Sequence, residues 1–194
     1  MLAWGLTAVA VMIGSGVAAS WYYAQSDGSP ELTGALADSA PLPAAPRGPS
    51  GLPLPRYVSL KSSKVNVRIG PSQDHGVAWV FNTAGLPVEI IAEFENWRRI
   101  RDSEGAEGWV YHSLLSGQRT ALVAPWQKDK ETPAELLYAS ADANSRPVAR
   151  LEHGALVRVE ECSRDWCEVL VAGVGGYLRQ DMLWGVYPGE HVTE

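Results

Sequence analysis

An internal repeat restricts the possible folds of this chain more than any other pattern in it. Trp97 and Trp166 lie 69 residues apart, and the aromatic residues Trp109 and Tyr177 lie 68 apart. Each copy runs in the same order: a Gly, an apolar strand, a turn, a Trp-led strand, a turn, an aromatic-led strand, and a Leu before a final Gly. Self-similarity at a fixed spacing indicates a repeated structural unit. Two copies of about 60 residues with about five short strands each predict two small barrels in tandem.

The pattern within each copy is that of strands. In the stretch PVEIIAEFE, residues 87–95, alternation would place Val88, Ile90 and Phe94 on one face and the glutamates mostly on the other. Turn residues follow at short intervals, at Asn96 and at Ser103-Glu104-Gly105. No long run after Arg56 shows the 3.6-residue period of a helix. We therefore predict an all-β fold for this part of the chain.

Residues 1–24 form an apolar segment, and the first 26 residues carry no charged side chain. Such a segment is long enough to cross a hydrocarbon core as a helix. Ala18-Ala19-Ser20 fits the cleavage site of a signal peptide, whereas Trp4 and Trp21 near its two ends resemble the aromatic belts of a retained signal anchor. Both interpretations place the rest of the chain in the periplasm or another extracytoplasmic compartment. In the second, residues 2–24 would anchor it in the inner membrane.

Residues 25–56 are rich in Pro, Ala and Gly and predict a semi-rigid spacer. The P-x-x-P spacings at Pro43/Pro46 and Pro46/Pro49 can also be ligands for aromatic grooves, so docking of this segment on its own barrel stays open. The repeat divides the remainder into a first barrel, a joint and a second, more divergent barrel, over residues 57–123, 124–133 and 134–194.

Three stretches of the first copy match a known domain pattern: VNVRIGPS, GLPVEIIAEFENWRRIR and EGWVYHSLLSG. They resemble the bacterial SH3-like (SH3b) domain family, with its N-V-R-x-G-P-S entry, its apolar strand before a Trp, and its late G-W-V motif followed by a 3₁₀ turn. The second copy has lost the Asn-x-Arg-x-Gly-Pro signature and resembles the family more loosely. The resemblance implies two tandem SH3-like barrels and a binding or targeting role, often in the cell envelope.

The same resemblance implies a binding site around the Trp-led strand WRRIRD. Ile100 should face the barrel interior, so alternation turns Trp97 and Arg99 to the opposite face. In SH3 domains a Trp at this position lines the ligand groove, and Tyr111 falls where they place a groove proline. The residues expected to bind a ligand are Trp97, Tyr111, Leu114, Arg99 and Trp109.

The sequence leaves open whether Trp97 binds a ligand and whether the second copy has a similar site, and it suggests weaker contacts at the rim of the groove. Trp97 could instead pack on a neighbouring loop or on the second module, because aromatic side chains are buried more often than they bind. In the second copy the matching positions are less aromatic and lie in acidic surroundings, which makes the first module the expected binder; they are Trp166, Arg179 and Met182. The loop after VNVR would flank the groove, with Gln73, Asp74 and His75 as rim contacts.

Catalytic and cofactor motifs are missing from the sequence. Gly70-Pro71-Ser72 is followed by neither Lys nor a helical pattern, so it is better interpreted as a bend than as a phosphate-binding loop. The four histidines, at 75, 112, 153 and 191, form no metal-ligand pair. We expect no catalytic residues, no metal and no cofactor.

The charge distribution argues against nucleic acid as a partner. Residues 57–123 carry seven Lys/Arg and seven Asp/Glu, and residues 128–194 carry seven and twelve. Neither half has the basic surplus that binding to phosphate backbones requires.

Cys162 and Cys167 stand on either side of a four-residue turn, ECSRDWCEV. Cross-strand neighbours lie within disulfide reach, so we predict that they pair in an oxidising compartment.

These features together predict an exported, non-enzymatic binding or targeting module of the cell envelope. Its expected partner is a peptide of peptidoglycan or an envelope protein. One alternative is a regulatory or scaffold subunit of a cell-wall enzyme. The other is a cell-wall hydrolase, since SH3-like domains accompany cysteine peptidases of the wall, although no stretch of this sequence remains to hold a catalytic domain.

Overall fold

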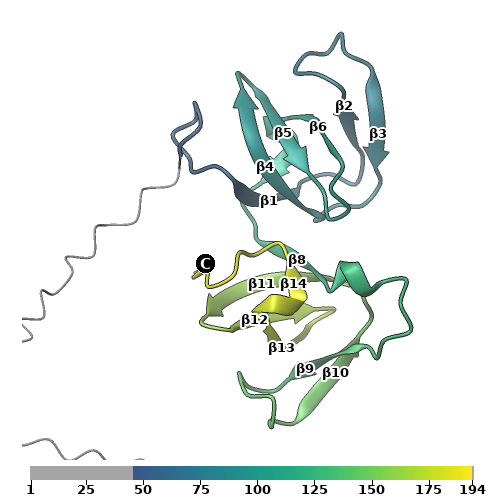
Figure 1. Cartoon of the computed structure of the whole chain (residues 1–194), viewed down its shortest axis with the longest axis vertical. Coiled ribbons are helices and arrows are strands. Elements are labelled where there is room, and N and C mark those ends of the chain that lie inside the picture. Colours follow the sequence, from purple (N-terminus) through teal and green to yellow (C-terminus); the bar gives the residue numbers. More distant parts are fainter. Residues whose placement is uncertain (1–45, 194) are drawn as a thin grey trace, which may run out of the picture. The chain divides into compact units, whose positions relative to one another are not determined.

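The computed structural model of the protein describes residues 46–193 (Figure 1). The predicted N-terminal helix over residues 1–24 and most of the linker lie outside this part. The described part is all-β, as the sequence predicts, and its helical elements are single 3₁₀ turns of three residues. None of the helices in residues 46–193 is long and apolar enough to cross a membrane.

The first module is one seven-stranded sheet with the order β3-β2-β6-β5-β4-β1-β7 (Figure 1). Its neighbouring strands are antiparallel. A 3₁₀ turn, η1 (His112–Leu114), leads from β6 into β7, where the family resemblance places it. The strands are β1 (Arg56–Leu60), β2 (Val65–Arg68), β3 (Val77–Phe81), β4 (Pro87–Phe94), β5 (Trp97–Arg101), β6 (Glu107–Tyr111) and β7 (Leu115–Ser116).

The second module repeats this topology strand for strand, in the order β10-β9-β13-β12-β11-β8-β14. Two 3₁₀ turns accompany it, η2 (Pro125–Gln127) after β8 and η3 (Gln180–Met182) before β14. The predicted internal repeat is therefore confirmed as a repeat of sheet order. The strands are β8 (Thr120–Val123), β9 (Glu135–Tyr138), β10 (Pro147–Leu151), β11 (Leu156–Ser163), β12 (Trp166–Val171), β13 (Val174–Arg179) and β14 (Leu183–Trp184).

One predicted boundary is wrong by a strand. The repeat predicts residues 120–123 at the end of the first barrel, but β8 pairs with β11 and β14 of the second sheet. In doing so it takes the place that β1 holds between β4 and β7. Ala121 and Val123 are fully buried in the core of the second module. Because these side chains are buried in the second core, β8 belongs to the second barrel.

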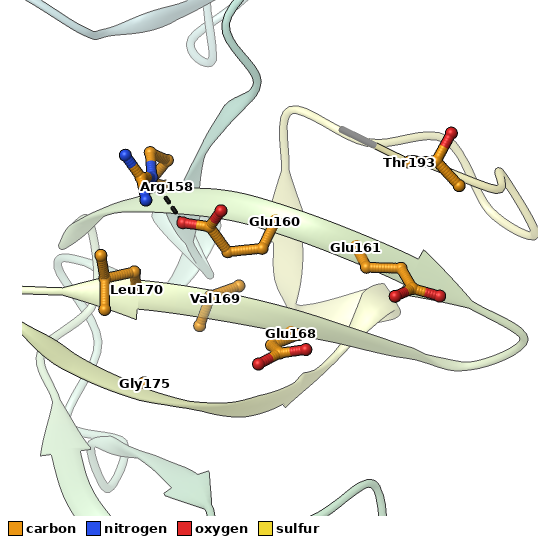
Figure 2. Close-up of a pocket in the computed structure, with 8 residues that line it drawn as sticks. All are labelled: Arg158, Glu160, Glu161, Glu168, Val169, Leu170, Gly175 and Thr193. Carbon is orange, nitrogen blue, oxygen red and sulfur yellow. Dashed lines mark hydrogen bonds and ion pairs between the residues drawn. The ribbon is translucent and has the colours of Figure 1, made fainter.

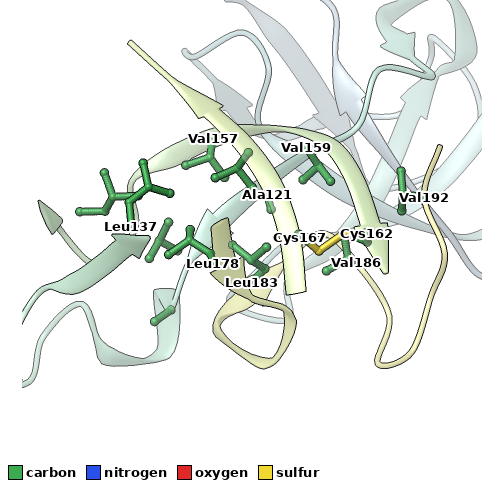
Figure 3. Close-up of a cluster of buried hydrophobic side chains, with 14 residues drawn as sticks. Ala121, Leu137, Val157, Val159, Cys162, Cys167, Leu178, Leu183, Val186 and Val192 are labelled. Carbon is green, nitrogen blue, oxygen red and sulfur yellow. A yellow bond between two sulfur atoms is a disulfide. The ribbon is translucent and has the colours of Figure 1, made fainter. Parts of the chain in front are cut away.

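Each module has its own apolar core. That of the first is formed by Leu60, Val65, Val67, Val88, Ile90, Ile100 and Val110. The core of the second includes the predicted disulfide, Cys162–Cys167, which is confirmed (Figure 3). The two cysteines face each other across the β11–β12 hairpin, with 4.1 Å between their Cα atoms. The bridge thus joins two strands of the core at the base of their turn.

The simple alternation expected along β4 fails at its end. The register between β4 and β5 shifts between Ile90 and Ala92, which marks a β-bulge. Beyond the bulge Phe94 is 50% exposed, whereas the side chain of Glu93 has no exposed surface. The predicted inward orientation of Phe94 is wrong because one extra residue reverses the side-chain order of everything after it.

The buried Glu93 holds the described end of the Pro-rich segment on the first module. Its carboxylate accepts hydrogen bonds from the Ser50 backbone N–H at 2.9 Å, the Ser50 hydroxyl at 2.8 Å and Arg56 at 2.6 Å. Burial alone raises the pKa of a carboxyl, but these hydrogen bonds and the charge of Arg98 outweigh it and lower the pKa of Glu93 to about 2. Docking of residues 46–55, left open by the sequence, therefore occurs through Glu93 and not through an aromatic groove.

Side chains of the second module contact the first module. The Tyr187 hydroxyl donates to the Glu89 carboxylate at 2.9 Å, and the Tyr187 ring lies 4.7 Å from that of Tyr57. The Thr120 hydroxyl donates to the Gly85 carbonyl at 2.7 Å. These contacts link the two modules through groups that are largely withdrawn from solvent.

Candidate functional site

The first module carries a hollow of about 270 Å³ on the outer surface of its sheet. We call it the Trp97 pocket. Its walls come from β2, the loop after β2, β5, the end of β6 and η1. The lining residues are Lys64, Asn66, Arg68, Gln73, Trp97, Tyr111, Ser113 and Leu114.

One wall of the Trp97 pocket follows from the two-residue period of the segment KVNVR. Val65 and Val67 point inward and are fully buried in the first core. The side chains between and beside them, Lys64, Asn66 and Arg68, must therefore point to the opposite face. The same alternation that builds the core thus places a row of polar and cationic groups along the pocket.

The opposite wall is aromatic. Trp97 and Tyr111 are direct cross-strand partners of β5 and β6, and their rings meet edge to face at 5.5 Å and 84°. This geometry is the one that aromatic pairs favour. Trp97 is only 8% exposed, so the pocket presents little of its indole, while the half-buried Tyr111 presents more. Leu114 completes this wall and also packs against the core.

The structure brings four of the predicted site residues together and leaves four apart. Trp97, Tyr111, Leu114 and Gln73 line the Trp97 pocket. The other four lie outside its lining: Arg99, Trp109, Asp74 and His75. Arg99 is instead paired with Glu107 at 2.8 Å. The other four lining residues were not predicted: Lys64, Asn66, Arg68 and Ser113. The alternation in KVNVR carries the signal for the first three of them.

The loop after β2 is shaped by close packing. A side chain at Gly70 would come within 2.4 Å of the His75 ring, so only glycine lets the ring lie against the backbone there. The His75 ring also contacts the Ser72 hydroxyl at 3.1 Å, and Arg68 donates to the His75 carbonyl at 2.5 Å. The Gly-Pro-Ser motif thus holds the loop that carries Gln73 to the pocket.

The charged side chains that line the Trp97 pocket are all positive. Five arginines of residues 56–119 form ion pairs with carboxylates: Arg56, Arg98, Arg99, Arg101 and Arg119. Lys64 and Arg68 form none within residues 46–193, and no acidic residue in that range lines the pocket. The pocket therefore offers two uncompensated positive charges beside an aromatic wall.

The second module has a smaller hollow around the repeated tryptophan. Trp166 meets Tyr138 edge to face at 5.7 Å and lines a volume of about 110 Å³. Glu161, Glu168 and Tyr177 line it too. The nearby Glu168 carboxylate, together with burial, raises the pKa of Tyr177. By strand register Glu168 and Tyr177 take the places of Arg99 and Trp109, which lie outside the Trp97 pocket, so the two hollows lie on different sides of the repeated tryptophan.

A wider, open hollow of about 570 Å³ lies on the second module over β11, β12 and β13 (Figure 2). Three carboxylates face it, those of Glu160, Glu161 and Glu168, and Arg158 is paired with Glu160. Within the described part of the chain, no three His, Cys, Asp or Glu side chains are grouped to hold a metal ion. None of the predicted site residues lies in this hollow.

Comparisons with solved structures give only distant likenesses. NlpC2 and NlpC1 from Trichomonas vaginalis each share 12% identity with the chain, with a TM-score of 0.30. An NlpC/P60 family protein from Bacillus cereus shares 10%, with a TM-score of 0.29. The matches cover 67%, 71% and 66% of this chain, which spans 48%, 48% and 55% of the solved ones, about half of their length. A comparison with curated proteins finds no match.

The family comparison agrees with the fold. The family model described as the bacterial SH3 domain matches residues 61–117 and again residues 131–185. Each segment contains six of the seven strands of one sheet and leaves out its first strand, β1 or β8, and together the segments cover more than half of the chain. The chain therefore belongs to the bacterial SH3 domain family, as a tandem pair of its domains.

Proposed function

We propose that the protein is a non-enzymatic binding module of the cell envelope that recognises a peptide of the cell wall through its Trp97 pocket. The observation that carries this proposal is the pocket itself. In a domain family that commonly binds cell-wall components, the first module presents a hollow with an aromatic wall and a polar wall. Aromatic and main-chain contacts of this kind are typical of modules that bind extended peptides.

Two features of the chain support the remaining parts of the proposal. Both of its cysteines are used in the Cys162–Cys167 disulfide, so it contains no thiolate to act as a nucleophile. A structural disulfide is also compatible with an extracytoplasmic location, where such bonds persist. The apolar segment over residues 1–24 supports export, either as a cleaved signal peptide or as a membrane anchor.

Retention of the full chain on insoluble peptidoglycan tests this proposal. We expect the chain to sediment with purified sacculi and expect Trp97→Ala to weaken the binding about tenfold or more, because it removes the ring against which Tyr111 packs in the aromatic wall. Trp126→Ala is the matched control because Trp126 is 47% exposed and lies outside the pocket. It should bind like the unmodified chain.

A second variant guards against misfolding, since Trp97 is largely buried. Asn66 is exposed on β2 and lines the pocket, so Asn66→Tyr fills the hollow without removing a core contact. Loss of retention in both variants, with unchanged circular dichroism, would support the proposal. Failure of the unmodified chain to sediment would contradict it; a stable complex with one envelope protein would then favour the scaffold alternative.

A further inference from the structure

The charge of the Trp97 pocket defines the chemistry of its ligand more narrowly than the family does. We propose that this pocket binds the free carboxylate of a short peptide, with Lys64 and Arg68 as the cationic partners; the inference rests on the proposed function and names the ligand group that this site takes. The occupant is a cell-wall peptide that ends in, or carries, a carboxylate next to a small apolar side chain.

The arginines of the first module outside the pocket are matched with glutamates at 2.6–3.3 Å, as in Arg56–Glu93 and Arg101–Glu89. Lys64, directly before β2, and Arg68, at the end of β2, have no carboxylate partner within residues 46–193. The one hydrogen bond printed for the Arg68 side chain goes to the His75 carbonyl, which leaves its charge unpaired. Cations without a carboxylate partner beside a hollow are suited to an anion brought by a ligand.

The two walls of the pocket together match a group that carries both a charge and an apolar side chain. The polar wall offers Lys64 and Arg68 as charged donors, with Asn66 and Gln73 as amide donors beside them. The wall formed by Trp97, Tyr111 and Leu114 offers apolar surface. A peptide carboxylate with a methyl or short aliphatic side chain presents an anion and an apolar group side by side, as these walls require.

The second module serves as an internal comparison. Strand register places Tyr138 where the first module has Arg68, and Arg179 where it has Tyr111. Arg179 is already paired with Asp181 at 2.9 Å. The cation at Arg68 is therefore specific to the first module and not a requirement of the fold.

The experiment compares tri-alanine that has a free C-terminal carboxylate with its C-terminal amide. Each is titrated into the isotopically labelled full chain in a mild nonionic detergent, and NMR reports the shift of the Trp97 indole N–H. We expect the acid to bind about tenfold more tightly than the amide, since a charge-assisted hydrogen bond contributes roughly that much. The preference should weaken as salt is raised.

Lys64→Gln should abolish the preference for the acid. Lys61→Gln is the matched control: Lys61 is exposed, forms no ion pair within the described residues, and lies outside the pocket. It should leave the preference unchanged. Equal binding of acid and amide, or an undiminished preference in Lys64→Gln, would overturn the inference. Binding of inorganic phosphate alone as tight as that of the acid peptide would also overturn it, because the site would then be a general anion site.

The two proposals can fail separately. If sacculi retain the chain but acid and amide bind alike, carboxylate recognition is overturned while the proposed function stands. If the acid peptide binds through Lys64 and sacculi do not retain the chain, carboxylate recognition stands and the cell-wall proposal is overturned. If the chain binds neither, both are overturned.

Discussion

At the scale of single residues, Glu93 shows how one buried charge can help to hold a Pro-rich segment on a sheet, beside the packing of Leu54 against the first core. Its carboxylate contacts Ser50 twice and also lies 2.6 Å from Arg56 and 3.2 Å from Arg98. A buried carboxylate is stabilising only when its partners satisfy it, and removing one member of such a set leaves the others unpaired. Glu93 therefore decides whether residues 46–55 stay on the first module.

Glu93→Gln should destabilise the protein in a pH-dependent way. The pKa of Glu93 is about 2 in the folded protein against an ordinary value of 4.5, so the unfolded chain binds the proton more tightly. Stability from the charged form is thus complete above about pH 4.5 and is lost as the pH falls towards 2. We expect the variant to lose about 3 kcal/mol at neutral pH, measured as a shift of the urea midpoint, and less at pH 3.

Glu104→Gln is the control for this comparison, because Glu104 is exposed and forms no ion pair within the described residues. It should shift the midpoint by no more than about 0.5 kcal/mol at either pH. A deficit of Glu93→Gln that is the same at pH 7 and pH 3 would show that the charge of Glu93 is not what holds the segment.

At the scale of elements, the sequence predicts those features that repeat and misses those that depend on an irregularity. The Trp-led strands and the hairpin disulfide follow from local pattern and spacing, and the 3₁₀ turn after Tyr111 follows from the family resemblance. The inward turn of Glu93 could not be predicted in this way, because a bulge between Ile90 and Ala92 leaves no mark in the hydrophobic period. Lys64, Asn66 and Arg68 were predictable in principle, since alternation around Val65 and Val67 fixes their direction.

The turns that close the two modules give a matched pair of glycines. Gly185 has a φ of 135°, and a Cβ there would stand 2.3 Å from the Thr120 carbonyl oxygen and 2.9 Å from the Ala121 Cα. A Cβ at its counterpart Gly117 would meet nothing within 4 Å. Because backbone cannot yield as a flexible side chain does, Gly185→Ala should cost at least about 2 kcal/mol, and Gly117→Ala no more than about 0.5 kcal/mol.

Urea unfolding of the two glycine variants, followed by tryptophan fluorescence, measures this difference. The slope of the transition should stay the same while the midpoint of Gly185→Ala falls. Similar midpoints for both variants would mean that β14 can move away from β8 at little cost, contrary to the packing described above.

At the scale of the whole molecule, the two modules share a cluster of tyrosines and carboxylates. Burial, followed by the charges of Glu89 and Glu190, raises the pKa of Tyr57 to about 12. Burial, followed by its hydrogen bond to Glu89, also raises the pKa of Tyr187. Both hydroxyls therefore stay protonated at neutral pH, and Tyr187 can donate to the Glu89 carboxylate from the other module. The described residues 46–193 lie within one compact unit, in keeping with such a link.

Tyr187→Ala should separate the unfolding of the two modules. The substitution removes the ring contact with Tyr57 and leaves the 8% exposed Glu89 with Arg101 as its remaining charged partner, at 3.3 Å. Truncating a packed aromatic and removing a hydrogen-bond partner of a buried carboxylate together cost about 3–5 kcal/mol of stability. This loss weakens the contact between the two modules and leaves both cores intact. Calorimetry of the unmodified chain should show one transition, and that of Tyr187→Ala two. Phe94→Ala, which truncates an aromatic that is 50% exposed, should keep the single transition. Two transitions in the unmodified chain would instead mean that the modules fold independently, and that the tyrosine cluster contributes too little to couple them.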